Sequence, residues 1–209
     1  MIGIIDYGMG NLHSVMNALR RLEIDHILSG EKSELDEVDA LLLPGVGAFK
    51  DAMHALKESG MDQYIVRNAQ AGKPILGICL GMQLLFEESE ENGITTGLGL
   101  LPGRVVRFSG TTVDGAHYKV PHMGWNELII KKPASRLLTD LQANHVYFVH
   151  SYYVKTDKRN VLLATADYYE EVPAVVGSDT IFGAQFHPEK SSVAGLKILK
   201  NFANYVRER

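Results

Sequence analysis

The sequence predicts an α/β fold with a mostly parallel central sheet, helices on both faces and added antiparallel strands. Three patterns support this prediction. Short aliphatic segments alternate with amphipathic helical segments from residue 2 to residue 78, as in proteins built on a parallel sheet. Several of these segments are apolar at nearly every position, which indicates strands covered on both faces. Beyond residue 103 the pattern changes to short strands separated by turns, which favours antiparallel pairing.

The first half of the chain alternates strands and helices. Strands are expected at residues 2–6, 24–28, 40–43 and 75–78, and helices at residues 12–22, 48–59 and 61–71. The helix at 12–22 shows the pattern clearly, because its apolar residues recur at helical spacing while Arg20 and Arg21 lie on the outer face.

The second half begins after a polar, glycine-rich loop expected at residues 92–103. Short strands are expected at residues 104–108, 126–130, 146–154, 161–166, 174–176 and 181–186. The chain closes with an amphipathic helix that includes residues 193–206. We expect these later strands to be the antiparallel additions to the parallel sheet.

The composition is that of an ordinary globular protein. Of 209 residues, 45% are hydrophobic and 22% are charged. No repeat or linker divides the chain, so we expect one domain over residues 1–209. The net charge of -4 gives no footprint for nucleic acid or an anionic membrane. No apolar run approaches the roughly 18 residues of a membrane span, and the opening residues resemble a strand and not a signal peptide; we therefore expect a cytoplasmic protein.

The single cysteine lies where a buried strand turns into a helix. Gly77 and Gly81 flank Cys79 two residues away on either side, the thiol form of the sharp strand-to-helix turn that exposes a nucleophile. Small residues are needed because such a turn crowds the backbone. The N–H groups of the following helix favour the thiolate form. The alternative is a structural cysteine at the end of a core strand, since free cysteine is among the most buried residue types.

A cysteine nucleophile needs a base, and the base needs an orienting group. His187 ends a strand and precedes Pro188, which disfavours a helical conformation at the residue before it. In extended chain Glu189 lies on the same side as His187 and can hold its ring. The alternative is a solvated turn. Three other histidines are rival bases, and none has a carboxylate two residues further on: His122, His145 and His150.

A second glycine-containing turn follows the strand at 40–43. Gly45 and Gly47 give the segment from Pro44 to Gly47 conformational freedom, so its backbone N–H groups can point at a ligand. An ordinary strand-to-helix turn explains the same pattern.

Together, the segments at 44–47, 77–83 and 186–189 resemble the class I glutamine amidotransferase family. The segments at 6–12, 121–126 and 147–152 are similar to one branch of it, the glutaminase subunits of imidazole glycerol phosphate synthase. The resemblance extends from residue 4 to the final helix and implies a class I amidotransferase-like fold. Three alternatives stay open: an amidotransferase subunit for anthranilate, aminodeoxychorismate or pyridoxal phosphate synthesis, a free-standing γ-glutamyl hydrolase, and a catalytically silent binding module.

The resemblance implies a role for each matching residue. Cys79 would attack the side-chain amide of glutamine to form a glutamyl thioester, with His187 as proton carrier and Glu189 as its orienting group. The oxyanion hole would be formed by Val46, Gly47 and Leu80. The substrate would be bound by Gly47, Gln83, Glu91, Ser151 and Tyr152. For Glu91 a solvated acidic helix end is an alternative, because Glu87, Glu88 and Glu90 lie nearby.

This chemistry requires no metal or other cofactor, and the sequence offers no phosphate-binding loop or metal-ligand spacing. The chain has room only for the ammonia-producing half, so we expect the acceptor to bind another chain. The resemblance implies that this partner is a (β/α)8-barrel cyclase that forms imidazole glycerol phosphate in histidine biosynthesis. Asn11, Tyr147 and Lys190 resemble positions at that contact. Exposed polar surface is the alternative for each of the three.

Overall fold

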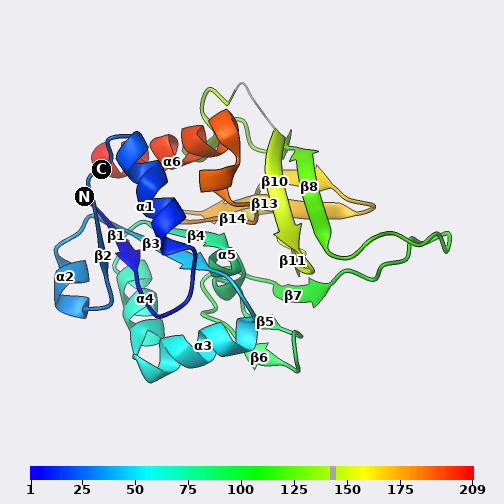
Figure 1. The fold of residues 1–209 in the computed structure, drawn as a ribbon, viewed down its shortest axis with the longest axis horizontal. Helices are drawn as coiled ribbons and strands as arrows, with labels where there is room; N and C mark the ends of the chain where they lie inside the picture. Colours follow the sequence, from blue (N-terminus) through cyan, green and yellow to red (C-terminus); the bar gives the residue numbers. More distant parts are fainter. Residues whose placement is uncertain (142–144) are drawn as a thin grey trace.

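A mixed eight-stranded sheet forms the centre of the computed structural model, which describes residues 1–141 and 145–209 (Figure 1). In sheet order its strands are β2 (His26–Ser29), β1 (Ile2–Ile5), β3 (Ala40–Gly45), β4 (Ile75–Cys79), β14 (Ile181–Ala184), β13 (Glu171–Ser178), β12 (Leu162–Asp167) and β9 (Ile129–Ile130). The first five run parallel, and each of the last three pairs antiparallel with its neighbour. The predicted α/β class is therefore confirmed.

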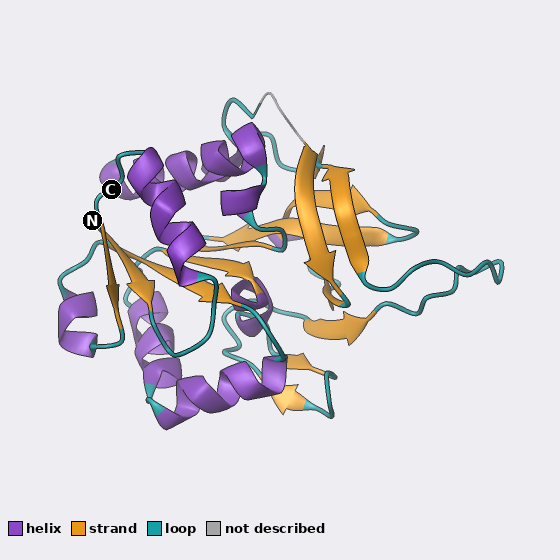
Figure 2. Ribbon diagram, in the orientation of Figure 1, coloured by secondary structure: helices purple, strands orange, loops and turns teal. Residues whose placement is uncertain are grey.

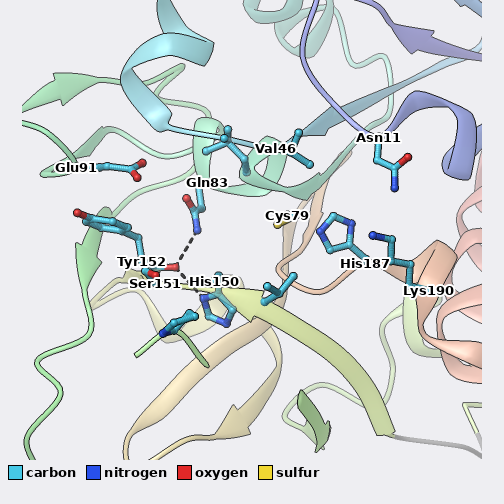
Figure 3. A pocket seen from close by; sticks show the side chains of 14 residues that line it. Asn11, Val46, Cys79, Gln83, Glu91, His150, Ser151, Tyr152, His187 and Lys190 are labelled. Atoms are coloured by element: carbon cyan, nitrogen blue, oxygen red, sulfur yellow. Dashed lines mark hydrogen bonds between the residues drawn. The ribbon is translucent and has the colours of Figure 1, made fainter. Parts of the chain in front are cut away.

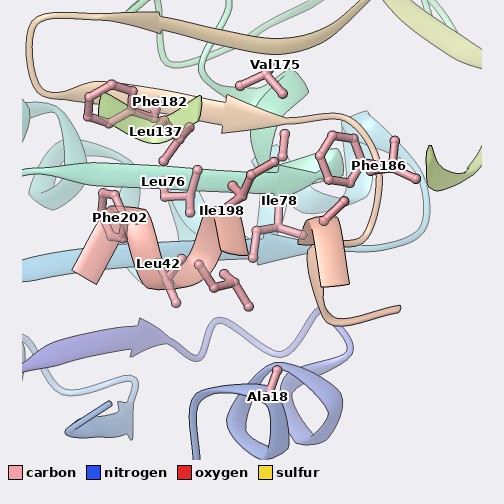
Figure 4. Packing of buried hydrophobic residues seen from close by; sticks show 14 of the residues in the cluster. Ala18, Leu42, Leu76, Ile78, Leu137, Val175, Phe182, Phe186, Ile198 and Phe202 are labelled. Atoms are coloured by element: carbon pink, nitrogen blue, oxygen red, sulfur yellow. The ribbon is translucent and has the colours of Figure 1, made fainter. Parts of the chain in front are cut away.

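Helices cover both faces of this sheet (Figure 2). One face carries α1 (Leu12–Arg21) and α6 (Ser192–Arg207); the other carries α2 (Lys32–Asp36), α3 (Phe49–Glu58), α4 (Met61–Gln70) and the short α5 (Leu80–Leu84). Successive strand residues point to opposite faces, so Leu42 joins the core under α1 and α6 while Leu41 and Leu43 join the core under α3 and α4. Figure 4 shows Ile198 and Phe202 of α6 packed against strand residues in the core under α1 and α6.

Two smaller sheets flank the central one. The first pairs β8 (His122–Glu127) with β10 (His145–His150), and the second has the order β11 (Tyr152–Lys155), β7 (Arg104–Arg107), β5 (Glu88–Ser89) and β6 (Thr95–Thr96). Three single turns of 3-10 helix complete the described chain: η1 (Arg136–Leu138), η2 (Arg159–Val161) and η3 (Pro188–Lys190).

The strand predicted at residues 146–154 is two strands in different sheets, so this prediction was wrong. β10 pairs with β8, whereas β11 pairs with β7. Ser151 lies between them and belongs to neither strand. Alternation in sequence shows which side chains point inward, but it does not show where a strand exchanges one partner for another.

Two other predictions about the second half also need correction. The strand predicted at 126–130 divides into β8, which begins at His122, and β9. β14 pairs antiparallel with β13 but parallel with β4, so it is the last strand of the parallel series and not one of the antiparallel additions. Its four residues are all buried, as expected of a strand with both faces covered.

The turn from β4 to α5 is packed against β3 with no room for additional side chains. A Cβ atom on Gly81 would lie 1.8 Å from the Leu43 carbonyl oxygen, and one on Gly77 would lie 2.5 Å from the Gly81 carbonyl oxygen. A Cβ on Gly45 would lie 2.7 Å from the Gly81 nitrogen. These three glycines therefore fix the distance between β3, β4 and α5.

Within the two described ranges, no helix is both long and apolar enough to cross a membrane.

We expect Gly81→Ala to lower the free energy of unfolding by more than about 3 kcal/mol, because its new methyl group meets backbone that cannot move aside. Alanine is the better helix former by about 1 kcal/mol, so the loss would come from crowding alone. The control is Gly115→Ala, where φ is +87° and no atom lies within 4 Å of the new Cβ; backbone strain there costs about 1–2 kcal/mol. Denaturant unfolding of both variants measures the difference. Equal losses would contradict the crowding argument.

Candidate active site

Cys79 lies at the end of β4, with α5 starting at the next residue. Its φ of +56° is in the left-handed region, which non-glycine residues rarely occupy. Only 8% of the residue is exposed, and it borders a cavity of about 410 Å³ (Figure 3). A strained backbone at the head of a helix therefore presents the sole thiol to an open cavity, as the elbow pattern predicts.

His187 lies beside Cys79 in the same cavity and is held from behind by Glu189. Its Nδ1 is 2.8 Å from Glu189 Oε1, and both side chains are almost fully buried. Pro188 begins η3, while His187 itself keeps an extended conformation with φ -93° and ψ 101°. The second Glu189 oxygen, Oε2, has no hydrogen-bond partner among the described residues.

The charge state of His187 follows from these neighbours. Burial alone lowers the pKa of its imidazole, but hydrogen bonding to Cys79 and Glu189, together with their negative charges, outweighs burial and raises the pKa to about 10. The geometry therefore favours the protonated, imidazolium form of His187. Such an arrangement can carry a proton to and from a substrate held over Cys79.

The rival histidines are not available as bases for this thiol. His150 lines the cavity, but its Nδ1 donates to the Tyr152 carbonyl oxygen at 2.8 Å and its Nε2 is 3.0 Å from His122 Nδ1. Burial is the main reason why the pKa of His150 falls to about 3, and burial also lowers the pKa of His122. His145 is exposed at the start of β10.

Four predicted substrate residues lie on the opposite side of Cys79 from His187 in the view of Figure 3. They line the cavity and are Gln83, Glu91, Ser151 and Tyr152. Gln83 is buried, and its amide donates to the Tyr152 carbonyl oxygen at 2.9 Å. Glu91 Oε2 accepts a hydrogen bond from the Phe49 N–H at 2.7 Å, at the start of α3.

The acidic residues near Glu91 do not form a solvated helix end, so that alternative was wrong. α5 ends at Leu84, and Glu88 belongs to β5. Glu87 accepts a hydrogen bond from the Gly103 N–H and Glu90 accepts one from the Arg107 N–H. These two carboxylates flank β5 and bind backbone N–H groups at the two ends of β7, within the four-stranded sheet.

The turn after β3 forms another wall of the cavity. Val46, Gly47 and Leu80 all line it, and Gly47 has a φ of +96° that favours glycine. The Tyr7 hydroxyl donates to the Pro44 carbonyl oxygen at 2.9 Å and fixes the beginning of the turn. Burial is the main cause that raises the pKa of Tyr7, so it remains a donor.

The three predicted contact residues are placed differently from one another. Asn11 and Lys190 line the cavity near His187 (Figure 3). Tyr147 does not line it; its ring faces Trp125 on the paired strand β8, with ring centroids 5.9 Å apart. The Tyr147 carbonyl oxygen accepts a hydrogen bond from the His187 N–H at 3.4 Å. Tyr147 therefore holds the backbone of His187 from the β8–β10 pair.

Sequence comparison agrees with this geometry. Residues 3–205 match the model of the glutamine amidotransferase class-I family. The chain belongs to the class I glutamine amidotransferase family.

Relatives of this amidotransferase match it over nearly their full length. It is 62% identical to the imidazole glycerol phosphate synthase subunit HisH of Halalkalibacterium halodurans, covering 100% of this chain and 97% of that one. It is 54% identical to the protein of the same name from Bacillus subtilis, covering 100% and 98%.

Solved structures share the fold of this amidotransferase at lower identity. A crystal structure of a glutamine amidotransferase superimposes with a TM-score of 0.75 at 20% identity and covers 100% of this chain and 99% of that one. The structure of PurLQS from Thermotoga maritima gives a TM-score of 0.71 at 20% identity, with 98% of both chains covered. The class I amidotransferase-like fold is thus confirmed.

Several residues around this cavity were not singled out as site residues by the sequence patterns. Pro121, Val149 and His150 line it, and Gln185 approaches Cys79 from within the protein. Gln185 could have been noticed, because it lies two residues before His187 in an extended segment. The described residues include no group of three or more His, Cys, Asp or Glu side chains that could hold a metal ion.

We expect Glu189→Gln to lower the pKa of His187, because the variant removes one of the two charges that raise it. A raised pKa adds stability that is complete below the ordinary value of 6.5 and disappears as the pH rises through about 10. The variant should therefore lose more unfolding free energy at pH 6 than at pH 10. NMR titration of the His187 ring, identified from the spectrum of His187→Ala, measures the pKa directly. An unchanged His187 titration would contradict the assigned pairing.

Proposed function

We propose that this chain is the glutaminase subunit of an imidazole glycerol phosphate synthase. It hydrolyses glutamine to glutamate and ammonia, and it supplies the ammonia to a cyclase that forms imidazole glycerol phosphate and aminoimidazole carboxamide ribotide in histidine biosynthesis. The observation that carries the proposal is the arrangement of Cys79, His187 and Glu189 at a cavity, in a chain 62% identical to a HisH subunit.

In the first half-reaction the thiol proton moves to His187, and the Cys79 sulfur attacks the side-chain amide carbon of glutamine to form a tetrahedral intermediate. His187 then donates a proton to the departing nitrogen, so ammonia leaves and a glutamyl thioester remains. Glu189 holds Nδ1 of His187 at 2.8 Å, which turns the other ring nitrogen toward the thiol and stabilises the imidazolium.

In the second half-reaction a water molecule attacks the thioester. His187 takes a proton from this water, the carbon–sulfur bond breaks to release glutamate, and the proton is again shared between His187 and the sulfur, as at the start. Atoms balance over the cycle, since glutamine and water give glutamate and ammonia. No metal or other cofactor enters either step.

The oxyanion is stabilised by backbone N–H groups of Leu80 and of the segment containing Val46 and Gly47. The proposal is supported by the position of all three residues around the cavity and by the left-handed conformation of Gly47. One donor of this kind contributes about 2.7–4 kcal/mol to transition-state stabilisation. The head group of glutamine would then lie against Gln83, Glu91, Ser151 and Tyr152 on the opposite side.

The partner would dock on the outer face of the β8–β10 pair. Met123 and Trp125 are apolar, 60% and 52% exposed, and they lie directly opposite Val149 and Tyr147 on the paired strand. Val149 also lines the cavity, so this apolar face continues to the cavity edge. There it meets Asn11 and Lys190. We infer that a (β/α)8-barrel cyclase covers the face and receives ammonia, with residues 1–209 as one amidotransferase domain acting in the cytoplasm.

We expect Cys79→Ala to abolish glutamine hydrolysis, by several orders of magnitude, while the complex with the cyclase still uses free ammonium. The reason is that only the release of ammonia needs the thiol. Glutamate release and cyclase turnover, each with glutamine or ammonium chloride, measure the two activities. Substantial glutaminase activity in a clean Cys79→Ala preparation would show that another residue is the nucleophile.

Val46→Pro removes a backbone N–H from the turn after β3. We expect the glutaminase rate of the complex to fall roughly 10²–10³-fold, with binding of the cyclase largely intact. Steady-state kinetics together with calorimetric titration of the partner separate these effects. A normal rate in the folded variant would exclude this N–H as an oxyanion donor.

Trp125→Ala should weaken binding of the cyclase by roughly 30-fold, as expected when a central exposed aromatic anchor is lost. The matched control is Ile94→Ala, because Ile94 is also apolar and is 71% exposed but lies outside the β8–β10 face. Calorimetric titration compares the two. A similar loss of affinity in both variants would place the contact elsewhere.

A further inference from the structure

Gln185 is a buried amide whose position relative to Cys79 is fixed by the central sheet. β14 pairs with β4 so that Ala184 lies opposite Ile78, which places the next residues, Gln185 and Cys79, beside each other. Gln185 has no exposed surface, and its Nε2 lies 4.0 Å from the Cys79 sulfur. It therefore meets the sulfur from inside the protein, away from the cavity.

The orientation of this amide is determined by a chain of hydrogen bonds. The chain starts at the Tyr152 carbonyl oxygen, which can only accept; it takes one hydrogen bond from Gln83 Nε2 at 2.9 Å and another from His150 at 2.8 Å. The amino group of Gln83 also donates to Gln185 Oε1 at 3.0 Å. Since the oxygen of Gln185 is used in this way, its amino group is directed at the sulfur.

The direction of the amide matters because the two possible orientations act on the sulfur in opposite ways. An N–H group directed at sulfur favours the thiolate over the thiol, since hydrogen bonds to an anion are stronger than those to a neutral group. The reversed amide would place a carbonyl oxygen against the developing negative charge. In a buried position, where little water screens the interaction, this difference is large.

We propose that Gln185 is a thiolate-stabilising residue for Cys79, held in its donating orientation by Gln83 and the Tyr152 carbonyl group. The inference rests on the proposed function, in which Cys79 is the nucleophile. In this arrangement two neighbours of the Cys79 sulfur have separate roles. His187 moves protons on the cavity side, and Gln185 supplies a fixed donor from the protein interior.

The test uses the fact that the chain has one cysteine, so alkylation by iodoacetamide reports on Cys79 alone. The rate is measured from pH 5 to pH 10 for the wild type and for Gln185→Met, which keeps the size of the side chain but removes the donor. We expect the half-maximal rate of the variant to lie at a pH about one unit higher. At pH values where the thiol is mostly protonated the variant should react about threefold more slowly, and its plateau rate at high pH should not fall, because a thiolate of higher pKa is the stronger nucleophile.

Two further variants separate this role from a general effect on folding. Gln83→Met leaves Gln185 in place without the partner that orients it, and should shift the half-maximal pH in the same direction by a smaller amount. The control is Asn201→Leu, which removes another buried amide whose hydrogen bonds reach the Leu137 and Thr139 carbonyl oxygens. It should leave the half-maximal pH unchanged. Circular dichroism monitors the fold of each variant.

The same half-maximal pH in the wild type and Gln185→Met would overturn the inference, as would equal shifts in Gln185→Met and Asn201→Leu. If Gln185→Met does not fold, Gln83→Met decides, and an unchanged half-maximal pH in that variant overturns the inference. Alkylation requires no glutamine. The two proposals can therefore fail separately. If Gln185→Met shifts the half-maximal pH as expected but the wild type does not hydrolyse glutamine in the presence of the cyclase, the proposed function is refuted and the role of Gln185 is not.

Discussion

The close packing of β3, β4 and α5 is the constraint on which the rest of this molecule depends. Three glycines allow the backbones of these elements to approach within distances that no side chain permits. At this turn Cys79 adopts a left-handed conformation, and its sulfur lies at the carboxyl end of the parallel strands, where ligand sites of open α/β sheets commonly lie. The turn after β3 and Cys79 line the same cavity at this edge of the sheet.

Around the sulfur, the molecule separates two kinds of interaction. On one side His187 is buried between Cys79 and Glu189, and its interactions with both raise its pKa. On the other side Gln83 and the Tyr152 carbonyl group form a neutral hydrogen-bonded layer. The chain that forms this layer comes directly from β10, the strand of the outer pair, through Ser151. The backbone therefore runs directly from the β8–β10 pair to the Tyr152 segment that lines the cavity.

The parallel half of the fold was predictable because its signals are local: apolar runs of strand length alternate with helical periodicity, and glycines flank Cys79 at the turn. The pairing of His187 with Glu189 was also predictable, since Pro188 restricts the chain between them. The break at Ser151 was not, because the choice of strand partner depends on contacts distant in sequence. Nor was the orientation of the Gln185 amide, since it depends on a hydrogen bond from Gln83, 102 residues away.

The single buried thiol has a consequence for oxidative damage. A sulfenic acid formed on Cys79 would normally be rescued by a neighbouring thiol, which converts it to a reducible disulfide. These 209 residues contain no second cysteine, so a rescuing thiol has to come from another molecule. It must reach the sulfur through the cavity that Cys79 borders, so glutamine bound there would exclude the oxidant and the reductant alike.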